Sequence, residues 1–184
     1  MNKINIKPMR KDLKKKLKVI KQNAEKIQEY IIDGEKELDK EYLLPDFTKM
    51  EIGDYFKFRI NQLLASLIIE TMSTIEGALK IIYQILNTSD NIQELHNVNV
   101  TKIISKFKRE TSVKMDQSDF RLLNTFIEKR NILVHEQFNI AAIENNESNQ
   151  YNYVISYINS SSRIINQYLK DIEQHLKKKG KRKK

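Results

Sequence analysis

The stretch LLASLIIETMSTIEGALKIIYQIL, Leu63–Leu86, decides the fold. Its apolar residues cover more than one face of a helix, and a helix of that kind is buried on several sides. We therefore expect a central helix from about Tyr55 to Leu86. Glu70 and Glu76 interrupt the stretch, and they lie either at the edge of the buried face or in the lining of a site.

Upstream, a second long helix is expected from about Pro8 to Glu41. Its apolar positions alternate in steps of four and three, with Gly34 in one slot: Leu13, Leu17, Ile20, Ala24, Ile27, Ile31 and Leu38. Such a heptad stripe packs against a partner helix, in the same chain or in a second copy. Pro45 and the segment Leu44–Asp54 are expected to form a linker.

Downstream, the pattern predicts three further helices, over Lys102–Arg109, Asp119–Phe138 and Tyr151–Lys178. Thr101 is the expected cap of the first, and Ser118 or Asp119 that of the second. Polar loops are expected between them, over residues 87–99 and 139–150. With only four glycines and two prolines and no strand alternation, the chain is predicted to be an all-α helical bundle.

Composition limits the chemistry of this 184-residue chain. It contains no cysteine, which excludes disulfides, thiolate nucleophiles and thiolate metal sites, and it has only three histidines. A net charge of +9 favours polyanionic partners. The start MNKINIKPMRKDLKKK is charged where a signal peptide would be apolar, and no apolar run reaches membrane-spanning length. We therefore expect a cytoplasmic protein that does not enter a membrane.

The predicted helix Asp119–Phe138 holds the one unusual polar cluster. Its apolar residues cover so much of its circumference that we expect packing on several sides: Phe120, Leu122, Leu123, Phe126, Ile127, Ile132, Leu133, Val134 and Phe138. Asn131 and His135 interrupt them and share one face, because they are four positions apart. Arg130 lies about 140° around the helix from His135. It needs a partner or solvent, because burying an unpaired guanidinium is costly.

The run Arg130-Asn131-Ile132-Leu133-Val134-His135 resembles the R-polar-x-x-x-H signature of HEPN domains. These are small helical bundles of toxin–antitoxin, phage-defence and RNA-processing systems. The resemblance covers about residues 55–178 and implies a HEPN-like up-down bundle of four to five helices with an added long N-terminal helix. The implied domain division is a basic heptad helix with a linker at 1–54, the bundle at 55–178, and a disordered basic tail at 179–184.

The resemblance also implies an endoribonuclease that needs neither a metal nor another cofactor and acts as a homodimer. Its two motif helices would face each other and form a shared cleft, in which the 2′-hydroxyl of RNA attacks the adjacent phosphate. His135 would then be the general acid or base, Arg130 would contact the scissile phosphate, and Asn131 would orient either group. Further RNA contacts are expected from basic residues near the motif and on the short basic helix: Lys129, Lys102, Lys106, Lys108 and Arg109.

Two alternatives remain open at this stage. One is a non-catalytic HEPN-like module that binds RNA or a protein, and the other is a helical adaptor whose first helix forms a coiled coil. An antitoxin or another regulatory protein is a possible partner. Many HEPN toxins that are paired with nucleotidyltransferase antitoxins carry a modified tyrosine where this chain has Gln137, so that mode of control is not expected. His96 and His175 are interpreted as surface residues.

Overall fold

The computed structural model describes residues 5–40, 46–86 and 99–181, and every regular element in these ranges is helical. The α-helices are α1 (Lys7–Lys40), α2 (Asp46–Leu86), α4 (Val100–Thr111), α5 (Gln117–His135) and α6 (Glu147–Lys181), and a 3-10 turn, η1, spans Ile140–Ala142. The predicted all-α bundle with a long N-terminal helix is thereby confirmed.

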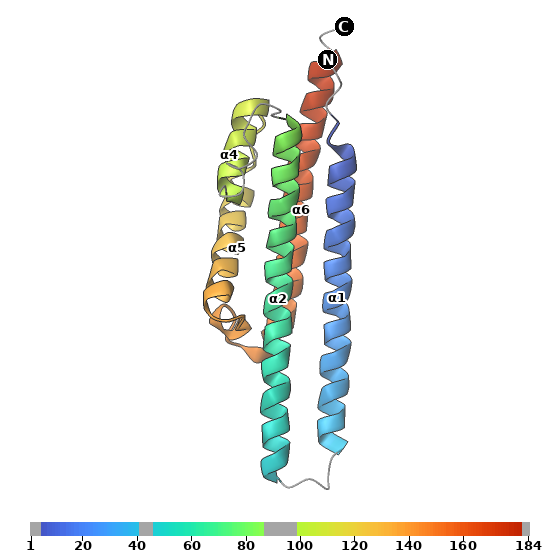
Figure 1. Cartoon of the computed structure of the whole chain (residues 1–184), viewed down its shortest axis with the longest axis vertical. Coiled ribbons are helices and arrows are strands. Elements are labelled where there is room, and N and C mark those ends of the chain that lie inside the picture. Colours follow the sequence, from blue (N-terminus) through green and yellow to red (C-terminus); the bar gives the residue numbers. More distant parts are fainter. Residues whose placement is uncertain (1–4, 41–45, 87–98, 182–184) are drawn as a thin grey trace.

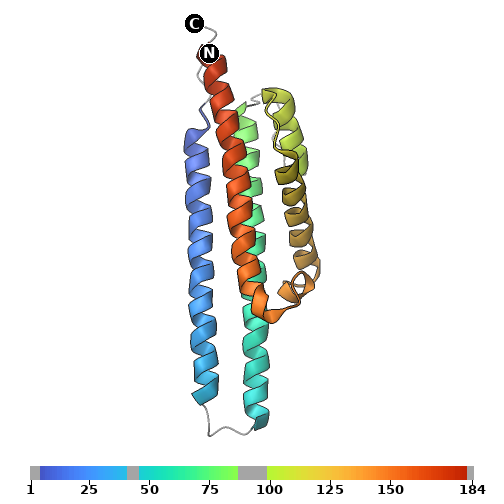
Figure 2. The same ribbon diagram turned by 180° about the vertical axis from the view of Figure 1, so that it is seen from behind.

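The helices form three layers (Figures 1 and 2). α2 and α6 lie in the middle, α1 packs against both from one side, and α4 and α5 pack against both from the other. α1 and α2 run antiparallel, and together they extend past the start of α6 (Figure 1). The first and last described residues lie at the same end of the bundle.

α2 is the central helix that its apolar sequence predicts. Ten of its side chains belong to the core: Ile60, Leu64, Ala65, Leu67, Ile68, Met72, Ile75, Leu79, Ile82 and Tyr83. The helix begins at Asp46 rather than at Tyr55, so the linker expected at 44–54 is wrong for residues 46–54. This end of α2 projects from the bundle, and Tyr55 and Phe58 are exposed there. Because this end of α2 does not pack on several sides, its sequence shows no apolar periodicity that would predict a helix.

The heptad stripe of α1 finds its partners in the same chain. Leu13, Leu17, Ile20 and Ala24 are buried, and they share one hydrophobic core with residues of all the other α-helices. Gly34 leaves room for the ring of Phe56, which a Cβ at this position would overlap. The side chain of Leu38 lies outside the described residues. α1 is therefore a layer of the bundle in this structure.

Several predicted helix ends need correction. α5 ends at His135 instead of Phe138, and its cap is Asp116, whose carboxylate accepts from the backbone N–H of Ser118 at 2.8 Å. α4 is capped by Asn99 rather than Thr101. The two cap shifts have one cause, because several neighbouring polar residues can each cap the same helix. α5 ends early because Gln137 and Phe138 adopt positive φ angles, which are not helical.

The last helix is longer than predicted. α6 begins at Glu147 and continues to Lys181, so the first part of the tail expected to be disordered is helical, and part of the loop expected at 139–150 is η1 or α6. Lysines are good helix formers, which explains how the helix extends into a segment with no apolar residue. Residues 182–184, and His96 in the loop expected at 87–99, lie outside the described residues.

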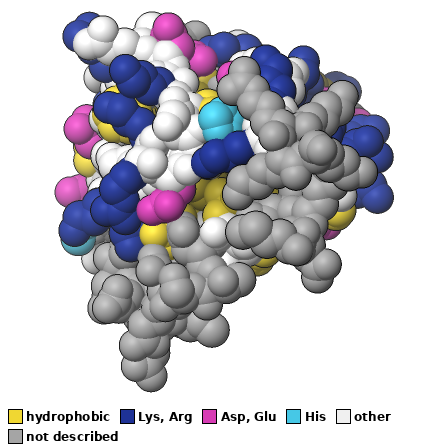
Figure 3. All heavy atoms as spheres, turned by 90° about the horizontal axis from the view of Figure 1, so that it is seen from above, with side chains coloured by type: hydrophobic (Ala, Val, Ile, Leu, Met, Phe, Trp, Pro, Cys, Tyr) yellow, Lys and Arg dark blue, Asp and Glu magenta, His cyan; other side chains and the backbone are white. Residues whose placement is uncertain are grey.

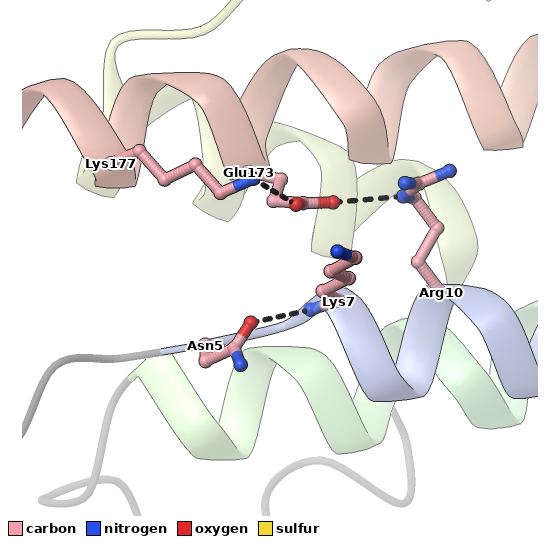
Figure 4. Close-up of polar contacts among 5 residues, drawn as sticks. All are labelled: Asn5, Lys7, Arg10, Glu173 and Lys177. Atoms are coloured by element: carbon pink, nitrogen blue, oxygen red, sulfur yellow. Dashed lines mark hydrogen bonds and ion pairs between the residues drawn. The ribbon is translucent and has the colours of Figure 1, made fainter.

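An ion-pair cluster joins α1 to α6 near the termini (Figure 4). Arg10 Nε donates to Glu173 Oε2 at 3.0 Å, and Lys177 Nζ bonds the other carboxylate oxygen. Glu173 is buried. The hydrogen bond from Lys177, together with that from Arg10, lowers the pKa of Glu173 although burial alone would raise it.

We predict that Glu173→Gln weakens this joint in a pH-dependent way. Because the folded-state pKa is lowered, the stabilisation is complete above the ordinary value of 4.5 and is lost as the pH falls through the lowered pKa. Urea unfolding followed by circular dichroism should give a variant about 1–2 kcal/mol less stable at pH 7, with a smaller loss on acidification than the wild type. Asp12→Asn, which removes an exposed ion pair with Lys16, is the control and should change little. Parallel pH profiles for the wild type and Glu173→Gln would contradict the assignment.

Candidate functional site

Arg130 is held by α2. Its Nη2 donates to Glu76 Oε2 at 3.1 Å, and the other oxygen of Glu76 pairs with Lys80 Nζ at 2.7 Å. The side chains of Arg130 and Glu76 are 25% and 21% exposed, so the pair lies at the edge of the core with limited access to solvent. Arg130 Nε is buried and has no hydrogen-bond partner among the described residues. Glu76 thus lies at the edge of the buried face of α2, and it is the ion-pair partner of Arg130.

Asn131 and His135 lie on the exposed surface of α5, one turn apart at its C-terminal end. Within the described part of the chain, no hydrogen bond joins Arg130, Asn131 and His135 to one another. The structure therefore places two motif residues on one open face and directs the third toward α2. A single chain does not assemble the three into one hydrogen-bonded group.

Several exposed apolar side chains lie near Asn131 and His135 in the chain. Leu122, Ile132, Val134 and Phe138 are 37–44% exposed, whereas only Leu123, Phe126 and Leu133 of α5 are buried. The expectation that α5 packs on several sides is therefore wrong for the single chain. α5 is an outer helix with α2 and α6 on one side only. Three of its apolar side chains, Leu122, Ile132 and Val134, are left exposed beside polar ones.

The chain turns sharply after His135. Gln137 and Phe138 have φ angles of 52° and 65°, in the left-handed region, which costs non-glycine residues about 1–2 kcal/mol each. The backbone N–H of Phe138 bonds the carbonyl of Leu133 at 2.8 Å and secures this turn. The strained turn sets the Phe138 side chain at the edge of a groove beside α2.

This groove has a volume of about 400 Å³ and begins directly after His135 in the chain. Aromatic and amide side chains contribute to its lining: Phe58, Phe138, Asn61, Gln62, Gln137 and Asn139. Phe58 is 55% exposed. Aromatic faces next to amide donors and acceptors are the groups with which proteins hold unstacked nucleobases. The sequence did not reveal this groove, because Phe58 and Phe138 are far apart in the chain.

The other predicted RNA contacts are dispersed. Thr101 Oγ1 bonds Asn124 Oδ1 at 3.3 Å, which places the start of α4 about 16 Å of helix before His135. Lys108 lines a groove with residues at the start of α5, still farther from His135. Lys106 lies over the ring of Tyr83, 5.0 Å from its centroid. Lys102, Lys108 and Arg109 are exposed, and Lys129 is half-buried on α5.

His175 differs from its expected place on the surface. It is half-buried, and its Nε2 atom is buried without a hydrogen-bond partner among the described residues. Tyr157 and Tyr168 of the same helix belong to the core, and their hydroxyls donate to the carbonyls of Phe126 and Ile104. Burial raises the pKa of both tyrosines. These groups are therefore not placed for contact with a substrate.

Glu76 offers a direct test of how Arg130 is positioned. We predict that Glu76→Ala lowers the free energy of unfolding by about 1–3 kcal/mol, because the partly buried guanidinium loses its acceptor. Glu76→Gln retains an amide oxygen for Arg130 and should recover part of that loss. Glu70→Ala, at an exposed position of the same helix, is the matched control. Equal unfolding midpoints for Glu76→Ala and Glu70→Ala would show that the ion pair contributes nothing to stability.

Within residues 5–40, 46–86 and 99–181, His, Asp and Glu side chains form no group of three or more that could hold a metal ion. In the same ranges, no helix is long and apolar enough to cross a membrane. Comparisons with models of protein families, with curated proteins and with solved structures found no match for this chain.

Proposed function

We propose that this chain is a metal-independent endoribonuclease of HEPN type that acts as a homodimer in the cytoplasm. The observation that carries the proposal is the outer face of α5, where Asn131 and His135 are exposed among uncovered apolar side chains. A soluble monomer gains nothing from such a surface, whereas a two-fold dimer would bury it and bring two copies of the motif together.

The chemistry follows from the available groups. His135 would accept the proton of a ribose 2′-hydroxyl, whose oxygen then attacks the adjacent phosphorus. The bond from phosphorus to the 5′-oxygen breaks, the leaving oxygen takes a proton from an imidazolium, and a 2′,3′-cyclic phosphate remains. Imidazole suits both steps because it exchanges protons near neutral pH.

Arg130 would stabilise the negative charge that develops on the phosphate oxygens. Glu76 anchors one end of its guanidinium, and the side chain is still 25% exposed, so a phosphate at the dimer interface could reach it. The groove lined by Phe58 and Phe138 would hold a base next to the scissile phosphate. A role in toxin–antitoxin or phage-defence systems, with an antitoxin or another regulator as partner, belongs to this proposal.

The test is cleavage of end-labelled RNA by the purified chain, with and without EDTA. We expect cleavage that the chelator does not stop, and products that carry a 2′,3′-cyclic phosphate. Loss of cleavage on adding EDTA would contradict the metal-independent mechanism, and a strict monomer in a solution mass measurement would contradict the shared cleft.

One observation favours a second candidate, a non-catalytic module that binds RNA or a protein. The guanidinium of Arg130 is already paired with Glu76, and such an ion pair can be purely structural. This candidate predicts an intact RNA substrate after prolonged incubation with wild-type protein.

A further inference from the structure

The N-terminal half of α1 carries a line of lysines. Lys7, Lys11, Lys14, Lys18 and Lys21 follow one another in steps of four and three, so they lie along one side of the helix. This line borders the buried stripe of α1. Farther along the helix, Glu25 occupies the next position and ends it.

The packing of α6 turns part of this line into a groove. Figure 2 shows α1 and α6 side by side. Five lysines line a groove of about 410 Å³ between the two helices: Lys11, Lys14, Lys15, Lys18 and Lys21. Leu17 and Ile158 supply its apolar lining, and Asn159 and Ser162 contribute polar groups from α6. Among the residues that the structure describes, no acidic side chain lines it.

The groove lysines lack internal counter-ions. None of the five forms an ion pair with another described residue, whereas Lys16, Lys36, Lys57 and Lys177 all do. Like charges at such spacing destabilise a helix by a few tenths of a kcal/mol per pair. Figure 3, seen from the end at which the termini lie, shows further Lys and Arg side chains around the described part of that end. Among the described residues, no carboxylate therefore neutralises these lysines by direct pairing.

We propose that this α1–α6 groove binds the phosphodiester backbone of RNA. From Lys11 to Lys21 the helix rises about 15 Å, which is long enough for several successive phosphates of one strand to lie along it. α1 lies across the central layer from α5, so this is a second RNA-binding surface, separate from the motif. The groove adds to the proposed function, but this RNA binding does not depend on whether the motif on α5 cleaves the RNA.

A membrane is the less suitable polyanion. Basic helices that lie on a bilayer insert an apolar face into it, and the apolar face of α1 is buried against α2 and α6. A concave groove also matches the shape of an RNA strand better than it matches the flat surface of a membrane. Phosphate contacts made by lysine carry little sequence information, so the groove should position RNA without selecting its sequence.

The test measures binding without cleavage, in a His135→Ala background. Lys11, Lys14 and Lys18 are changed to Gln together, and fluorescence anisotropy gives the Kd for a 16-nucleotide RNA strand and for a 16-base-pair RNA duplex. We expect the affinity to fall about 100-fold at 0.1 M salt, and the slope of log K against log salt to fall by about 2 for the strand or about 3 for the duplex. A loss of affinity for either probe supports RNA binding by the groove. The difference between the two losses shows whether the groove prefers a single strand or a duplex.

The matched control changes Lys16, Lys26 and Lys36 to Gln, which removes the same charge from exposed positions of α1 outside the groove. Equal losses from both triple variants would show an effect of net charge alone and overturn the proposal. Unchanged RNA binding by the groove variant would also overturn it, and if binding to phosphatidylserine vesicles is lost instead, the groove serves a membrane. Thermal unfolding of each variant verifies the fold. A wild type that binds RNA through the groove and leaves it intact would overturn the nuclease proposal alone.

Discussion

We expect His135→Ala to lower the rate of RNA cleavage by about 10²–10⁴-fold, the range that a positioned general acid or base contributes. His135 is exposed at the end of α5, so its removal creates no cavity and leaves the fold intact. Arg130→Ala should cost about 10²–10³-fold through lost stabilisation of phosphate charge. It should also lower stability, because Glu76 then loses its partner. Single-turnover cleavage of labelled RNA measures both effects.

Two controls separate catalysis from charge and folding. Lys36→Ala removes an exposed cation from α1, away from the α5 face, and His175→Gln removes a histidine from α6. Both should cleave RNA at nearly the wild-type rate. In cells, the wild type should slow growth and degrade RNA, while the motif variants should not. Equal cleavage by the wild type and His135→Ala would remove the histidine from the mechanism.

The sequence predicts the parts of the fold that are buried on several sides. Leu63–Leu86 and the stripe of α1 contain strong periodicity, because each turn of these helices contacts neighbouring helices. The start of α2 lacks that signal, because Tyr55 and Phe58 are 65% and 55% exposed. The same reasoning explains the error on α5, where Leu122, Ile132 and Val134 resemble buried positions in sequence but are exposed.

For the candidate site, spacing alone places Asn131 and His135 on one face. It does not show that Arg130 turns toward Glu76, 54 positions earlier, because that contact depends on how α5 packs against α2. Nor does it show that α6 closes a groove over the lysines of α1. The charge of +9 is visible in the composition, but only tertiary packing separates lysines with carboxylate partners from those without.

Leu17→Ala should lower the free energy of unfolding by about 2–5 kcal/mol, the usual cost of removing a buried leucine side chain. Leu17 is 2% exposed and lies where α1 packs against α2 and α6. The loss would be a large part of the 5–15 kcal/mol by which most domains are stable.

If α1 were a free arm or half of an intermolecular coiled coil, the same change would leave the unfolding of a monomer almost unaltered. Val19→Ala, at a 53% exposed position of the same helix, is the matched control and should stay within about 0.5 kcal/mol of the wild type. Urea unfolding of the wild type and both variants at two protein concentrations makes the distinction, because only an intermolecular role of α1 makes the loss caused by Leu17→Ala depend on concentration. Leu17 also lines the lysine groove, so a loosened α1 should weaken RNA binding together with stability. A Leu17→Ala variant as stable as Val19→Ala would show that α1 does not belong to the folded core.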